Sequence, residues 1–303
     1  MGSLSAQNVG SNYARQVNTL IGTKGVGLTS GYLYPGATYP YGMVQFTPSY
    51  FSKRSGFVIN QLSGGGCEHM GNFPTFPVKG KLKMSPDNIL NYRINISEEK
   101  GHAGYYEAKV QEDIHAKLTV TERTGMASYE YPADQQYGTV IIGGGISATP
   151  IEQAAIVITA PNKCEGYAEG GNFCGLRTPY KVYFVAEFDT DALESGTWKR
   201  NELKPNTTFA EGEYSGVYFT FDVDKKKNVQ YKIGVSYVSV ENARENLKAE
   251  NTGWDFLQIQ NQAESKWNHY LGKIEVEGTN PDRTTQFYTI CIVHSFTRTY
   301  AVM

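Results

Sequence analysis

The chain twice alternates between apolar and polar side chains with a period of two, first through residues 182–189 and again through residues 217–224. Successive side chains of a β-strand point to opposite faces, so this pattern predicts strands with one face in a core and the other in water. Similar strand signals lie at 105–110, 116–122, 127–131, 139–142, 156–159 and 231–240.

Turn-forming residues separate these stretches, as in Ser85-Pro-Asp-Asn88 and Lys204-Pro-Asn206. Gly, Pro, Asn and Asp favour tight turns because they accept backbone conformations that other residues avoid. Many short strands bounded by turns predict a mostly β fold, an antiparallel β-sandwich. We expect this sandwich domain to span residues 15–240, after a flexible N-terminus at residues 1–14.

The pattern changes after residue 240. Residues 241–250 are rich in Ala, Glu, Lys and Leu, which favour helix, and residues 252–271 carry apolar side chains at roughly helical spacing. Gly272 fits a helix stop, and a further helix is expected from residue 284. Residues 241–303 therefore predict a short helical linker. Its last apolar helix either packs back on the sandwich or begins something larger.

Charge and hydropathy exclude two classes of partner. The chain has 28 basic and 30 acidic residues, a net charge of −2, which argues against nucleic acid or an anionic membrane surface. No window approaches the roughly 18–20 apolar residues of a membrane span. The chain is also rich in aromatic residues, with 22 Tyr, 14 Phe and 3 Trp. We interpret most of these rings as sheet packing and a few as surfaces for sugar rings.

The N-terminus and the cysteines bear on the compartment. Residues 3–7 resemble the cleavage end of a bacterial secretory signal, without its charged and apolar parts, so a signal-peptide remnant is one interpretation of this end. Such a remnant would mean a secreted, periplasmic or cell-surface bacterial protein. Cys164 and Cys174 lie in a loop-like stretch, where a short disulfide and two free thiols are both open. Cys67 and Cys291 complete the set, and no zinc pattern is present.

Two short motifs carry little chemistry. Residues 143–148 fit a dinucleotide fingerprint literally, but Pro150 and the strand signal at 156–159 argue for a Gly-rich turn instead. Cys67 and His69 flank one residue in a Gly-rich bend, and neighbouring side chains on an extended chain point apart, so we interpret this cysteine as structural. Spacing selects no carboxylate pair suited to glycoside hydrolysis.

Residues 54–74 are rich in hydrogen-bonding side chains. Amide, hydroxyl, imidazole and guanidinium groups gather there around a run of glycines. Such groups on closely approachable backbone suit hydroxyl-rich ligands.

Several ordered motifs resemble glycoside hydrolase family 92. They begin with Tyr34-Pro-Gly-Ala-Thr-Tyr-Pro-Tyr-Gly-Met-Val-Gln-Phe-Thr-Pro48 and continue at 104–110, 118–123, 131–132, 237–247, 267–278 and 287–289. The resemblance covers nearly the whole chain. Two departures are Val58-Ile-Asn-Gln-Leu-Ser-Gly64, where many members have Ser-His-Thr-His-Leu-Ser-Gly, and the drift of residues 287–294 from the family pattern.

The resemblance implies an exo-acting, inverting, calcium-dependent α-mannosidase acting on mannose-containing glycans, as in N-glycan degradation. It implies a β-supersandwich, a helical linker and an (α/α)6 barrel that holds the catalytic carboxylates and the calcium ligands. Residues 241–303 would be the linker and the start of that barrel, so no catalytic or metal-binding residue, and no bound calcium, is predicted in this chain. The partner would be the missing C-terminal catalytic domain.

The segment 54–74 and the resemblance together predict one wall of a sugar site. We expect its residues at one end of the sandwich, on an exposed surface facing the barrel: Asn60, Gln61, Ser63, Gly64, Gly65, His69 and Asn72. The alternative is a stand-alone carbohydrate-binding protein without catalysis.

Overall fold

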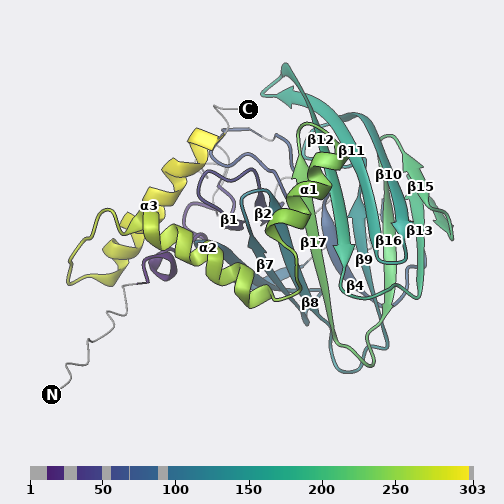
Figure 1. Cartoon of the computed structure of the whole chain (residues 1–303), viewed down its shortest axis with the longest axis horizontal. Coiled ribbons are helices and arrows are strands. Elements are labelled where there is room, and N and C mark those ends of the chain that lie inside the picture. Colours follow the sequence, from purple (N-terminus) through teal and green to yellow (C-terminus); the bar gives the residue numbers. More distant parts are fainter. Residues whose placement is uncertain (1–11, 24–32, 50–55, 68, 88–94, 300–303) are drawn as a thin grey trace.

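A computed structural model describes residues 12–23, 33–49, 56–67, 69–87 and 95–299. It contains two large sheets packed face to face (Figure 1), and every strand pairing within them is antiparallel. The predicted antiparallel sandwich is therefore confirmed.

The smaller sheet has eight strands, in the spatial order β1 (Ala37–Thr38), β2 (Gln45–Pro48), β3 (Phe57–Val58), β4 (Thr75–Lys79), β9 (Tyr137–Gly143), β16 (Ser215–Asp222), β13 (Glu194–Lys199) and β14 (Glu202–Pro205). The larger sheet has nine, in the order β15 (Phe209–Glu211), β10 (Ile151–Ala160), β11 (Lys163–Phe173), β12 (Leu176–Phe188), β17 (Asn228–Ser236), β8 (Thr124–Glu130), β7 (Ile114–Val120), β6 (Tyr105–Val110) and β5 (Ile96–His102).

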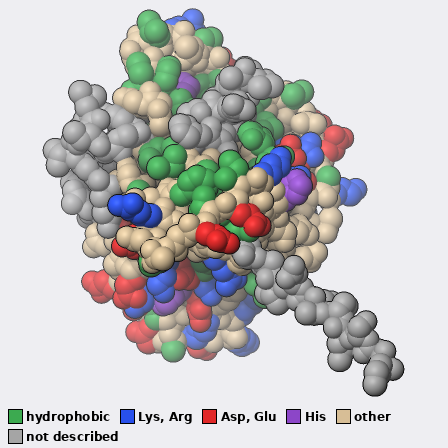
Figure 2. Space-filling model, turned by 90° about the vertical axis from the view of Figure 1, so that its left-hand side faces the viewer, with side chains coloured by type: hydrophobic (Ala, Val, Ile, Leu, Met, Phe, Trp, Pro, Cys, Tyr) green, Lys and Arg blue, Asp and Glu red, His purple; other side chains and the backbone are tan. Residues whose placement is uncertain are grey.

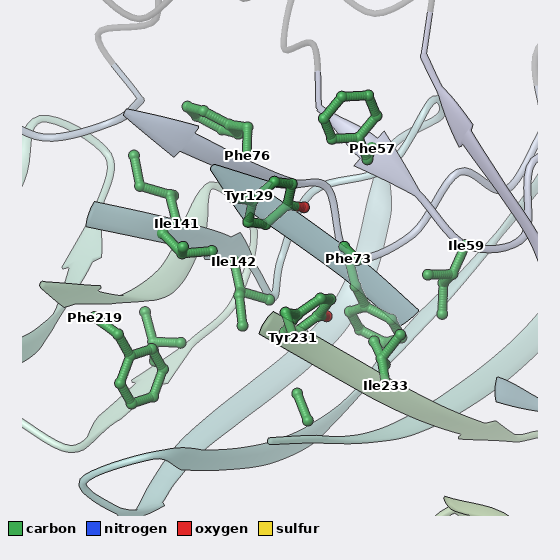
Figure 3. Close-up of a cluster of buried hydrophobic side chains, with 14 of the residues drawn as sticks. Phe57, Ile59, Phe73, Phe76, Tyr129, Ile141, Ile142, Phe219, Tyr231 and Ile233 are labelled. Carbon is green, nitrogen blue, oxygen red and sulfur yellow. The ribbon is translucent and has the colours of Figure 1, made fainter. Parts of the chain in front are cut away.

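Aromatic rings fill the space between the sheets, as the composition suggested. Phe57 of β3 stacks on Tyr129 of β8 with ring centroids 6.2 Å apart, and Phe188 of β12 lies 5.3 Å from Tyr231 of β17. Figure 3 shows Phe57, Phe73, Tyr129 and Tyr231 among the aliphatic side chains of this core. Burying such rings from both sheets supplies the main driving force for the sandwich.

Strand β16 differs from the expectation of one wet face. Its apolar side, including Phe219, is buried, but Tyr218 and Thr220 on the other side are buried as well. The Thr220 hydroxyl lies 2.8 Å from that of Thr139 on the neighbouring β9, so the polar group has a partner out of water. On that side the Tyr218 ring lies against Gly196 of the neighbouring strand β13.

Three helices follow the sandwich: α1 (Val240–Glu250), α2 (Phe256–Leu271) and α3 (Pro281–Thr299). Helix α1 lies on the larger sheet, where Ala243 and Leu247 cover Val185. Helix α2 starts at Phe256 rather than at the expected residue 252, because the Asp255 carboxylate accepts a hydrogen bond from the Gln258 N–H and so caps the helix. Within the described residues, no helix combines the length and apolar character that a bilayer crossing requires.

The N-terminal segment packs on the helices. A short 3₁₀ helix, η1 (Ala14–Gln16), contacts α2 and α3, and the backbone N–H of Ala14 donates to the Asn268 side chain at 2.7 Å. The expected flexible N-terminus falls mostly on residues 1–11, which lie outside the described residues. Residues 12–14 are held in place, so the helical part of the molecule includes both ends of the described chain.

Candidate functional site

Two buried asparagines lie at the centre of the predicted sugar-binding segment, which connects β3 to β4. Asn60 Nδ2 donates to Asn72 Oδ1 at 3.0 Å, and the Asn72 backbone N–H donates back to Asn60 Oδ1 at 2.7 Å. The Tyr180 hydroxyl on β12 also donates to Asn72 Oδ1, at 3.0 Å, and Asn60 Nδ2 lies 3.4 Å from the Tyr237 hydroxyl. Tyr237 immediately follows β17, so the asparagine pair joins this segment to the larger sheet near the start of α1.

Gln61 and Ser63 face the 34–48 motif rather than solvent. Gln61 Nε2 donates to the Tyr34 hydroxyl at 2.8 Å, and the Tyr34 backbone N–H donates to the Ser63 hydroxyl at 3.3 Å. Both side chains are buried. The expectation that the predicted site residues form an exposed surface is therefore wrong for Asn60, Gln61, Ser63, His69 and Asn72, because their polar groups are needed to hold the segment together.

The glycines of the bend remain accessible. Gly64 is exposed and has a φ of +77°, a conformation that an L side chain adopts only with strain. Gly65 is half-buried, and a Cβ placed there would come within 2.8 Å of the Leu62 side chain. The exposed part of the predicted site is thus backbone, where a ligand can come close to peptide groups.

A disulfide between Cys67 and Cys174, with Cα atoms 5.7 Å apart, joins this bend to the end of β11. The two arrangements left open for Cys164 and Cys174 are both incorrect. Residues 164 to 173 belong to the extended strand β11 rather than to a loop, and Cys174 directly follows that strand. A strand advances about 3.3 Å per residue, so these two cysteines stand roughly 30 Å apart and cannot bond. Cys164 is a buried free thiol whose pKa is raised by burial.

His69 lies between the bend and the β11–β12 hairpin. Its Nδ1 is 3.0 Å from the Asn172 carbonyl oxygen, and its ring centroid is 4.9 Å from Phe173 and 5.5 Å from Tyr180. Burial lowers the pKa of the imidazole, and the hydrogen bond to the Asn172 carbonyl only partly opposes this shift. A neutral ring is therefore favoured near pH 7.

A cavity of about 710 Å³ lies beside His69, Phe173 and Tyr180. Its described lining combines rings and thioethers with a few polar groups: Met43, Leu62, His69, Met70, Phe173, Thr178, Pro179, Tyr180, Lys181 and Tyr237. Apolar cavities with a few placed polar groups are typical of small-ligand sites, and aromatic rings can pack on the apolar face of a pyranose. Of the seven predicted site residues, only His69 lines it.

Sequence reasoning missed Phe173, Tyr180 and Tyr237. These residues come from three places in the larger sheet, and only their pairing in that sheet brings them to the bend. The sequence held two related signals: the abundance of tyrosine, which does not select individual residues, and the family motif at 237–247, which begins with Tyr237.

The cavity's described lining includes no carboxylate, and the described residues contain no group of three or more His, Cys, Asp or Glu side chains placed to hold a metal ion. The residues described here therefore do not fit a calcium site, and we derive no reaction step through that ion.

Comparison with known proteins identifies the family of the chain. The model for the glycosyl hydrolase family 92 N-terminal domain matches residues 16–236, and the model for the family's catalytic domain matches residues 242–299. A relative described as an uncharacterized secreted glycosidase from Arthroderma benhamiae is 26% identical over 302 residues, covering 87% of this chain and 38% of the relative.

Solved structures show the same fold. A family GH92 alpha-mannosidase from Bacteroides thetaiotaomicron superposes with a TM-score of 0.79 at 24% identity, over 92% of this chain and 40% of that one. A family GH92 inverting mannosidase from the same organism gives 0.78 at 23% identity, over 94% and 39%. The chain thus spans about two fifths of the length of these relatives. Because the N-terminal-domain model alone matches most of its residues, the chain belongs to glycosyl hydrolase family 92.

Proposed function

We propose that this chain is the sugar-binding front part of an exo-acting α-mannosidase that is inverting and calcium-dependent, and that the cavity beside the Cys67–Cys174 disulfide is one wall of its sugar site. Family membership supports the glycosidase class, and two structural neighbours are mannosidases, which supports mannose as the sugar. The assignment of this cavity as one wall of the sugar site rests on its aromatic lining and on the glycine backbone beside it.

The described side chains divide into two roles. The rings that would face the sugar are Phe173, Tyr180 and Tyr237. Asn60 and Asn72 do not line the cavity and instead hydrogen-bond to the two tyrosines and to each other. A hydrogen-bonded network of buried polar groups keeps a binding surface rigid, and rigidity reduces the entropy lost on binding. The predicted residues Gln61 and Ser63 would support the site indirectly, through their hydrogen bonds to Tyr34.

The catalytic carboxylates and the calcium ion belong, in this proposal, to the catalytic domain that completes the enzyme. This chain would supply binding and orientation of the sugar and exclusion of water. The match of residues 242–299 to the catalytic-domain model favours this proposal over a stand-alone carbohydrate-binding protein.

The surface around α3 would dock the rest of the catalytic domain. Figure 2 shows hydrophobic side chains gathered on the face of the molecule that carries the helices. Ile290 on α3 and Ile274 between α2 and α3 are more than half exposed. A contiguous exposed apolar patch is typical of an interface.

The disulfide between Cys67 and Cys174 supports export of the protein from the cytoplasm. Disulfides persist in oxidising compartments, and the relative from Arthroderma benhamiae is described as secreted. Secretion to the cell surface or periplasm is therefore part of the proposal, and bacterial origin remains a prediction from residues 3–7.

The complete enzyme tests the wall assignment. Phe173→Ala should raise KM for an aryl α-mannoside several-fold, because it removes a ring from the cavity. Phe209→Ala, on the remote edge strand β15 and more than half exposed, is the matched control and should leave KM unchanged. Equal KM values for the two variants would move the sugar site away from this cavity.

A further inference from the structure

The hydrogen bond between His69 and Asn172 fixes which ring nitrogen carries the proton. A backbone carbonyl oxygen can only accept, so His69 Nδ1 must donate its hydrogen to Asn172 across the 3.0 Å contact. In the neutral ring Nε2 then has a lone pair and no hydrogen. Among the described residues no group hydrogen-bonds to this nitrogen, and His69 lines the cavity.

The β11–β12 hairpin holds the Asn172 carbonyl in position. The strands pair up to Phe173 and Leu176, and Asn172 Oδ1 accepts the Gly175 N–H at 3.1 Å, which closes the turn. The next residue but one, Cys174, is bonded to Cys67 of the glycine bend. The rest of the tip is exposed, and the disulfide, the His69 contact and the Phe173 ring beside Gly65 attach it to the bend.

The two tyrosine hydroxyls near His69 are already engaged in hydrogen bonds. Tyr180 donates its hydroxyl hydrogen to Asn72, and Tyr237 lies with its hydroxyl 3.8 Å from the Met70 sulfur while receiving the Asn60 amide. Lys181, also in the lining, is a donor only. His69 Nε2 is therefore an acceptor whose natural complement is a hydrogen-bond donor on the ligand.

We propose that the tip of the β11–β12 hairpin is a positioning element: through the Asn172 carbonyl it holds His69 with Nδ1 protonated, so that Nε2 accepts a hydrogen bond from a hydroxyl of the sugar bound in the cavity. The ligand class rests on the proposed function, whereas the positioning of the imidazole does not. The low pKa caused by burial keeps the ring in the neutral form that this role needs.

Long-range ¹H–¹⁵N NMR of the oxidised chain, without ligand, tests the positioning. The His69 ring should show Nδ1 protonated and Nε2 unprotonated. Reduction, or the double variant Cys67→Ala/Cys174→Ala, should shift the ring toward the Nε2–H form, because the tip is released. Cys291→Ala, which removes a half-buried thiol on α3, should leave the signal unchanged. An Nε2–H ring in the oxidised protein, or an unchanged ring after reduction, overturns the positioning.

Two variants of the complete enzyme test the acceptor. His69→Asn keeps an amide near the Nδ1 position but nothing at Nε2, while His69→Gln places an amide near Nε2. His69→Asn should raise KM for an aryl α-mannoside about tenfold, equivalent to about 1.4 kcal/mol, and His69→Gln should restore part of the loss. Equal KM values for His69→Asn and wild type overturn the acceptor role. These variants keep both cysteines, so the result stands even where the cysteine double variant fails to fold.

The two failures are distinguishable. If Phe173→Ala leaves KM unchanged while the NMR signature is as expected, the proposed sugar site fails and the hairpin still positions His69. If Phe173→Ala raises KM while His69→Asn does not, the cavity binds sugar without the imidazole, and this inference is wrong.

Discussion

At the residue scale, the carboxyl group of Glu264 on α2 has a strongly lowered pKa. Its side chain is only 6% exposed and accepts hydrogen bonds from His102 Nε2 at 2.9 Å, Gln260 Nε2 at 2.7 Å and Arg15 Nε at 3.0 Å. Burial alone would raise the pKa of this carboxyl, but the three donors outweigh burial and lower it to about 2. The group therefore joins η1, the end of β5 and α2.

This pKa predicts a dependence of stability on pH. A carboxyl with a folded-state pKa near 2 and an ordinary value of 4.5 stabilises the fold above pH 4.5, and the contribution disappears as pH falls toward 2. We expect a loss of roughly 2–3 kcal/mol over that window. Urea unfolding of wild type and Glu264→Gln between pH 2 and 6 measures it.

The variant should be less stable than wild type near pH 6, and the two should converge at low pH. Glu245→Gln, an exposed position on α1, is the control and should follow the wild-type curve. Parallel curves for Glu264→Gln and wild type would contradict the assignment.

Asn60 gives a second prediction at this scale. Asn60→Ala leaves the Asn72 N–H buried without its acceptor, and an unsatisfied buried donor costs about 1–3 kcal/mol. The urea midpoint should fall accordingly, while Asn201→Ala, on the exposed β13–β14 turn, should leave it within error. A normal midpoint for Asn60→Ala would show that water replaces the missing amide.

At the element scale, α1 lies so close to β17 at Gly234 that no side chain fits at this position. A Cβ on Gly234 would come within 2.5 Å of the Ala243 carbonyl oxygen and 2.7 Å of the Leu247 Cβ. Gly234→Ala must therefore push the helix away from the sheet, and overpacking of this kind costs about 1–3 kcal/mol.

Thermal unfolding should show a lower Tm for Gly234→Ala. Gly278→Ala is the matched control, because a Cβ there meets only the Thr284 hydroxyl at 3.6 Å, an ordinary contact. An unchanged Tm for Gly234→Ala would mean that α1 is held less tightly than the contacts of Ala243 and Leu247 indicate.

At the scale of the whole molecule, this chain should be inactive on its own. The described lining of the cavity has no carboxylate to act as general acid or base, and the loss of such a group costs orders of magnitude in rate. Purified chain should not hydrolyse aryl α-mannosides with or without calcium, whereas the same chain extended by the family's catalytic domain should. Turnover that survives rigorous purification of the short chain would contradict this prediction.

The local hydrophobic periodicity of the sequence predicted strands and helices well where one face of the element is buried and the other is exposed. The signal at 105–110 coincides with β6, and the helical spacing before Gly272 ends with α2 at Leu271. It failed for β16, which is buried on both faces, and for residues 164–174, whose glycines suggested a loop. Glycines in β11 allow close approach of its neighbours: a Cβ on Gly166 would lie 2.1 Å from the Ala155 carbonyl oxygen.

The sequence by itself determined the antiparallel sandwich, the helical end and the family, because alternation, helical spacing and ordered motifs are local properties of the chain. Only the tertiary structure decided that Cys67 bonds to Cys174, that Asn60 and Asn72 are buried against each other, and that rings from β11, β12 and the end of β17 form the cavity. The reason is physical: the disulfide joins residues 107 positions apart, and the cavity brings rings of the larger sheet to the bend between β3 and β4 of the smaller sheet. Which distant strands meet is set by sheet order and register, and side-chain pattern alone does not fix either.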